Sequence, residues 1–214
     1  SLSKPSDPTS PKIKDLNDAL TYDDFLTKYG LPANTNMTSV ESNGGMVNSD
    51  TRILTLYNKT SGQEVVKATY VYSSSLTAPD GKADFYKYPE DGTMNMVHTM
   101  IGTPTPGSID ASQVPTPPDN GGPSAIPSLL ITELVTNPAG PAPDLYDMIE
   151  LYNNSDRPVS PTGYSITSLS PNGAMETWHI TEDKIIQPHS TLIVWVKNAT
   201  SGAQLSLIDF LNFY

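Results

Sequence analysis

The chain contains two groups of short β-rich runs, separated by a stretch dense in proline, glycine and serine at residues 103–127. In the first group, a turn cluster joins Arg52–Tyr57 to Glu64–Tyr72, which predicts a β-hairpin. In the second group, Thr191–Val196 is an almost continuous apolar run, typical of a central strand covered on both faces. Short strands punctuated by turns predict an all-β fold rather than a helical or α/β one.

The amino-acid composition further restricts the fold and the function classes that are possible for the chain. Hydrophobic residues make up 36% of the 214 residues, with 20 prolines and 14 glycines, which suits one sandwich core of about 100 residues. The absence of cysteine excludes disulfide scaffolds, cysteine zinc sites and thiol catalysis. A net charge of −11 disfavours direct binding to nucleic acid or to anionic lipid. No apolar run approaches the roughly 20 residues of a membrane helix.

Two further elements are predicted in the first group. Apolar residues at helical spacing in Leu20–Tyr29, followed by Gly30, predict a short helix with a glycine C-cap. Met94, Met96, His98 and Met100 alternate with other residues, which predicts a strand with one packed face.

The end of the sequence repeats part of its beginning. Leu205, Asp209, Phe210, Leu211 and Tyr214 each stand 185 residues after an identical residue, from Leu20 to Tyr29. Five identities at one offset indicate tandem repeats. Because Ser1–Pro5 resembles neither a translation start nor a signal peptide, we expect an internal piece of a longer protein.

The segment Ile149–Asn153 is the most distinctive of the second group, and around it lie the strands Ile131–Leu134 and Gly163–Ile166 and the apolar run ending at Val196. At these residues the sequence resembles the lamin-tail domain, an immunoglobulin-like β-sandwich. The later strands of the family resemble residues 53–57 and 64–70, which here precede the earlier ones. The resemblance implies a sandwich in circularly permuted or swapped order, with one or two short helices.

This order predicts three segments. Residues 1–107 form the later half of one repeat, residues 108–127 a linker, and residues 128–214 the earlier half of the next repeat. A half sandwich exposes open edges and an uncovered apolar face. The halves therefore close on each other, either within one chain, which the tether favours, or between chains in a domain-swapped dimer.

Candidate metal ligands are few. His98, His179 and His189 show no ligand spacing, so they are expected on strand or turn surfaces. Asp144, Asp147 and Glu150 cluster at a loop-to-strand junction and are candidates for a structural calcium site, although no EF-hand loop is present. Solvated loop carboxylates are the alternative. Glu133 and Glu150 match acidic positions common in the family, which implies a role in the fold. No other cofactor is expected.

Two aromatic residues are candidates for ligand binding. Trp178 and Tyr164 lie on predicted strands, where they could stack on sugars or contact a partner, with ordinary core packing as the alternative.

These features favour a non-catalytic, secreted or cell-surface module that spaces, anchors or targets a larger bacterial protein. Neighbouring domains of the parent chain are the expected partners, with cell wall or polysaccharide as further possibilities. Two alternatives stay open. The chain could supply a substrate surface to an extracellular metallophosphoesterase or nuclease, or it could be a carbohydrate- or cell-wall-binding module.

Overall fold

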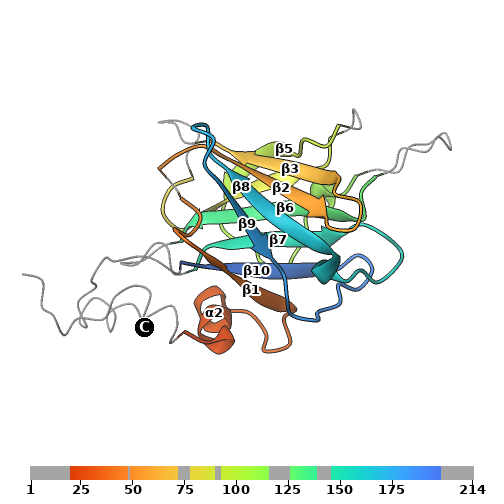
Figure 1. Cartoon of the computed structure of the whole chain (residues 1–214). Helices are drawn as coiled ribbons and strands as arrows, with labels where there is room; N and C mark the ends of the chain where they lie inside the picture. The colour runs from red at the N-terminus through yellow and green to blue at the C-terminus, as the bar shows by residue number, and fades with distance from the viewer. Residues whose placement is uncertain are drawn as a thin grey trace, which may run out of the picture.

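A computed structural model of the chain describes residues 20–47, 49–71, 78–89, 93–115, 126–138 and 146–198. These residues form two β-sheets packed face to face, with a helix beside one of them (Figure 1). The elements are α2 (Tyr22–Tyr29), β1 (Met37–Ser42), β2 (Arg52–Asn58), β3 (Glu64–Tyr70), β4 (Lys82–Lys87), β5 (Val97–Gly102), the 3₁₀ helix η1 (Ala111–Gln113), β6 (Leu129–Asn137), β7 (Met148–Asn153), the 3₁₀ helix η3 (Pro161–Gly163), β8 (Tyr164–Leu169), β9 (Met175–His179) and β10 (Thr191–Asn198).

Both sheets mix strands from the two groups that the sequence defines. The six-stranded sheet has the order β1-β10-β7-β6-β4-β5, and the four-stranded sheet has the order β3-β2-β8-β9. Three pairs join the groups: β1 with β10, β4 with β6, and β2 with β8. The predicted immunoglobulin-like sandwich is confirmed, and strands from both groups of the chain build each of its two sheets.

The position of strand β10 explains its almost continuous apolar sequence. Its side chains alternate between the two faces of the sheet. Leu192, Val194 and Val196 join the core between the sheets, whereas Ile193 and Trp195 face outward and pack beneath α2. All five are fully buried. A central strand covered on both faces can carry apolar residues at every position.

Helix α2 ends before Gly30, as its sequence predicts, but it begins at Tyr22 rather than at Leu20. The side chains and backbones of Thr21 and Asp24 form a reciprocal capping box at the N-terminus. Gly30 ends the helix with φ 64°, and its N–H is bonded to the last turn. The apolar side chains of Phe25 and Leu26 are buried against the outer face of the six-stranded sheet.

Strand β1 was not predicted, because its sequence has only two strongly apolar residues, Met37 and Val40. It pairs in parallel with β10 over six residues, from Met37 opposite Ile193 to Ser42 opposite Asn198. Because the parallel partner is so distant in sequence, the residues around β1 contain no pattern that indicates the pairing.

The packed face expected of the methionine-rich strand is largely wrong. Met96 is buried, but Met94 and Met100 are 41% and 56% exposed. Met94 and Met96 precede β5, and Met100 lies on it. Strand β5 is an edge strand that pairs with β4 alone in its sheet, across a register shift between Phe85 and Tyr86. An edge strand has less of its surface covered by neighbours.

The start of the predicted linker contacts the sandwich. Gln113, at the end of η1, is buried, and its side-chain N–H group donates to the carbonyl oxygens of Tyr86 and Thr132. Residues 116–125, the middle of the predicted linker, lie outside the described residues, as do residues 205–214 of the predicted repeat.

Candidate functional site

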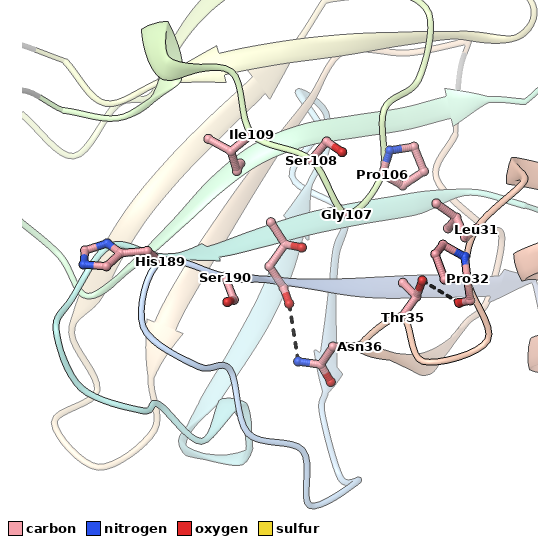
Figure 2. A pocket seen from close by; sticks show the side chains of 11 residues that line it. Leu31, Pro32, Thr35, Asn36, Pro106, Gly107, Ser108, Ile109, His189 and Ser190 are labelled. Carbon is pink, nitrogen blue, oxygen red and sulfur yellow. Dashed lines mark hydrogen bonds between the residues drawn. The ribbon is translucent and has the colours of Figure 1, made fainter.

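A cavity of about 570 Å³ opens where three distant segments meet (Figure 2). The connection from α2 to β1, the loop that follows β5, and the turn that leads into β10 each form one wall. Its lining is mostly backbone, hydroxyl and apolar groups, from Leu31, Pro32, Thr35, Asn36, Pro106, Gly107, Ser108, Ile109, His189, Ser190 and Thr191.

The wall before β1 is fixed by hydrogen bonds. The Asn36 side chain donates to the carbonyl oxygens of Ile185 at 3.1 Å and of Thr191 at 3.3 Å. Thr35 Oγ1 donates to the carbonyl oxygen of Pro32 at 2.7 Å (Figure 2). Because the bonds from Asn36 join the first group of strands to the second, the cavity exists only when the sandwich is closed.

His189 occupies the second wall in an unusual backbone conformation, with φ 53°. It follows Pro188 in a turn closed by a bond from the Ser190 N–H to the Gln187 carbonyl at 3.2 Å. A positive φ after proline is the geometry of a type II turn. The His189 ring lies 3.0 Å from Asp156 Oδ1 through Nε2 and 3.4 Å from the Tyr152 hydroxyl through Nδ1. The ring is therefore held at the cavity rim.

Two buried carboxyl groups hold the third wall. Glu133 and Glu150 are opposite each other on β6 and β7. Glu133 accepts bonds from the backbone N–H and the hydroxyl of Thr105, while Glu150 accepts one from the Gly107 N–H at 2.7 Å. Thr132 Oγ1 also donates to Glu150, at 2.8 Å. The pair anchors the loop after β5 to the sheet.

Burial makes this pair electrostatically unusual. Burial, reinforced by the neighbouring charge of Glu150, raises the pKa of Glu133 to about 8. Burial also raises the pKa of Glu150 to about 7, against the bonds from Thr132 and Gly107 that favour its ionised form. The fold role that the family resemblance implied for both residues agrees with these contacts.

Asp147, one of the predicted metal residues, also supports a loop. It is fully buried, and its Oδ2 accepts a bond from the Met46 N–H at 2.6 Å. The neighbouring Gly45 has φ 68°, and a Cβ placed there would lie 3.0 Å from the same Oδ2. The loop between β1 and β2 therefore requires glycine at this position.

We expect Gly45→Ala to lower the free energy of unfolding by about 1–3 kcal/mol, since it adds left-handed strain and a close contact. Urea unfolding measures the change. Gly44→Ala is the matched control, because Gly44 lacks a positive φ and a Cβ there meets nothing within 4 Å. Equal losses in the two variants would contradict this account.

The three acidic metal candidates are not seen together. Asp147 and Glu150 stand three residues apart around the start of β7, so their side chains point to opposite faces. Asp144 lies outside the described residues. Within the part of the chain that the structure describes, no three His, Asp or Glu side chains are grouped to hold a metal ion. The calcium site stays a prediction.

The two aromatic candidates lie elsewhere. Trp178 is only 2% exposed and belongs to the core between the sheets, so its ring cannot stack on a ligand while the sandwich is closed. Tyr164 is partly buried and packs against the same core. Core packing, the alternative considered for both residues, accounts for their positions.

Sequence reasoning missed the cavity of Figure 2 and its lining residues. The type II turn was the one local signal available, because Pro188 precedes a residue that must adopt a positive φ. The other two walls depend on the parallel pairing of β1 with β10 and on the buried carboxyl pair.

The fold and these loop anchors define an immunoglobulin-like β-sandwich module. Residues 122–212 match the model of the Lamin Tail Domain family, the same family that the sequence resembles. This family is a non-enzymatic immunoglobulin-like domain. The match covers β6 to β10, whereas α2 and β1 to β5 lie outside it.

Uncharacterized protein YvnB of Bacillus subtilis (strain 168) is 35% identical to the chain over 94 residues. These residues are 42% of this chain and 7% of that protein, so the match spans a small part of a much longer relative. No solved structure matches the chain. Among the described residues, no helix has the length and apolar character needed to cross a membrane.

Proposed function

We propose that the chain is a repeated, non-catalytic spacer and accessory module of a larger extracellular bacterial protein. One observation carries the proposal. The residues that recur near the end of the sequence match those through which α2 begins and docks, namely Leu20, Asp24, Phe25, Leu26 and Tyr29. Because the residues that recur are those that cap α2 or pack it against the sheet, their recurrence supports repetition of the module itself.

In this proposal, residues 1–107 are the later half of one repeat and residues 128–214 the earlier half of the next, joined by a linker at 108–127. The short match to a long relative supports a module within a larger chain. The net charge of −11 supports solubility outside the cell.

The cavity of Figure 2 favours a second candidate function. Hydroxyl and amide groups beside apolar walls can bind a neutral polar ligand such as a carbohydrate. The module would then attach its parent protein to cell wall or polysaccharide, or present a substrate to a catalytic domain.

Two assays of the purified chain separate these functions. A spacer is expected to show no phosphoester turnover with added divalent metals and no retention on peptidoglycan or polysaccharide columns. Turnover that copurifies with the chain would overturn the proposal.

Retention on a column would instead favour the second candidate. Ser108→Trp, which fills the cavity from an exposed position, should then abolish retention. Ser61→Trp, in the exposed turn between β2 and β3, is the matched control and should leave it intact.

A further inference from the structure

The outer face of the six-stranded sheet carries an apolar surface that α2 covers, named here the helix-docking surface. It consists of Met37, Ala83, Phe85, Val135, Tyr146, Met148, Ile193 and Trp195. The residues come from both groups of the chain, and all of them are buried. The surface is therefore complete only in the closed sandwich.

Aromatic contacts give this surface its specificity. The Phe25 ring lies 5.3 Å from the Trp195 ring and 4.8 Å from the Tyr29 ring, between ring centroids. Tyr146 stacks on Trp195 at 6.3 Å, and the Tyr29 hydroxyl donates to the Tyr146 carbonyl at 2.9 Å. Rings at these separations add to the stabilisation from burial.

The sequence contains a second set of the residues that make these contacts. Phe210 and Leu211 correspond to the buried Phe25 and Leu26, and Tyr214 corresponds to Tyr29. The capping residues recur as well. Ser206 stands in the place of the N-cap Thr21, and Asp209 in that of Asp24, and serine is a residue type that N-caps favour.

The positions that changed are mainly those facing solvent. Asp23 and Thr27 are exposed on α2, and their counterparts are Ile208 and Asn212. The half-buried Tyr22, whose hydroxyl donates to Glu182, is replaced by a leucine. Lys28, whose ammonium group lies over the Tyr146 ring, corresponds to Phe213. The most buried docking residues are therefore kept while the others vary, as expected when both segments fit one surface.

The end of β10, which precedes the second segment in the sequence, lies beside the same surface. The Lys197 ammonium group donates to the carbonyl oxygen of Leu20 at 3.3 Å, so the end of β10 lies next to the start of α2. From Asn198 to Leu205 the chain has seven residue steps, which span at most about 25 Å. An eight-residue helix is only about 12 Å long, so the tether is long enough for the second segment to reach the surface.

We propose that residues 205–214 are an alternative occupant of the helix-docking surface within the same chain, in exchange with α2. The two segments carry the same anchors and the surface has room for one. Docking of one therefore releases the other, which becomes available to the helix-docking surface of a neighbouring repeat. The exchange within this chain goes beyond the proposed spacer role, and only the docking on a neighbouring repeat rests on that proposed function.

Phenylalanine substitutions in the complete chain test the exchange. Phe25→Ala alone should lower the folding equilibrium constant, measured in urea, by no more than about tenfold, since residues 205–214 replace α2. The same substitution in a chain ending at residue 204 should cost about a hundredfold or more. Phe210→Ala alone should leave the folding equilibrium constant almost unchanged. Combined with Phe25→Ala, it should reproduce the large decrease in that constant.

Thr27→Ala and Asn212→Ala are the matched controls, at positions that do not dock. If Phe25→Ala prevents folding of the shortened chain, Leu26→Ala paired with Leu211→Ala gives the same comparison with a smaller deletion. The proposal would be overturned if the effects on the folding equilibrium constant were additive, with Phe210→Ala having no effect in the original chain or in the Phe25→Ala variant. Rescue that appears only with dimers in light scattering would also overturn it, in favour of a second copy as the occupant. Neither result would bear on the spacer assays.

Discussion

Residues 122–214, expressed without the first part of the chain, are expected to remain unfolded although they contain the complete match to the family model. Without β1 to β5, the six-stranded sheet keeps only β10, β7 and β6, and the four-stranded sheet keeps only β8 and β9. The fully buried residues Leu54, Leu56 and Tyr86 would be absent from the core, along with the other buried side chains of the first group. Each such side chain contributes roughly 1.5–3 kcal/mol by burial, so the loss exceeds the 5–15 kcal/mol stability of a typical domain.

Circular dichroism and urea titration of the fragment measure this result. Mixing it with residues 1–121 should restore a cooperative transition, because the missing strands then return as a separate chain. The matched control is the complete chain cut at a protease site introduced within residues 116–125, which breaks the same connection after folding and should stay folded. Cooperative unfolding of the isolated fragment would contradict the shared core.

The second large effect concerns pH. Both carboxyl groups of the buried pair have folded-state pKa values raised above the ordinary value of 4.5, to about 8 for Glu133 and about 7 for Glu150. A raised carboxyl pKa means that the folded state binds more protons than the unfolded state above pH 4.5. The contribution to stability is therefore complete below about pH 4.5 and is lost as the pH rises through 7 to 8. We expect the protein to be less stable at pH 9 than at pH 5.

Glu133→Gln should remove much of this loss. The amide oxygen can still accept the bonds from Thr105, but it carries no charge. At pH 9 the variant should exceed the original chain in free energy of unfolding by on the order of 3–5 kcal/mol, with little difference at pH 5. Urea unfolding across this range measures the crossover. Glu41→Gln, at an exposed position of β1, is the control. A variant less stable than the original chain at every pH would refute the assignment.

The sequence predicted most of the fold because most strands carry their own signal. Apolar and β-branched runs such as Thr191–Val196 can be stable only as covered strands, and Gly30 marks a helix end through its left-handed conformation. Strand β1 carries no such signal, since its partner β10 supplies the pairing and most of the apolar contact. The exposure of Met100 was equally hidden, because edge position depends on sheet order.

The candidate site could be predicted only in part. The carboxyl groups of Glu133 and Glu150 were recognisable as residues of the fold, but their loop partners depend on contacts across the sheet. The cavity is less accessible to sequence reasoning, because its walls come from segments up to about 160 residues apart, such as Leu31 and Thr191. The metal prediction depends on Asp144 and gains no support from the described residues.

The parallel pairing of β1 with β10 determines how the module transmits mechanical tension. A pull on the chain from both sides enters β1 at Met37 and leaves β10 at Asn198, at opposite ends of two neighbouring strands that run in the same direction. The force then acts along the strands and shears all six paired positions at once, rather than peeling them apart one by one. A module built this way resists stretching at the contact that joins its two parts.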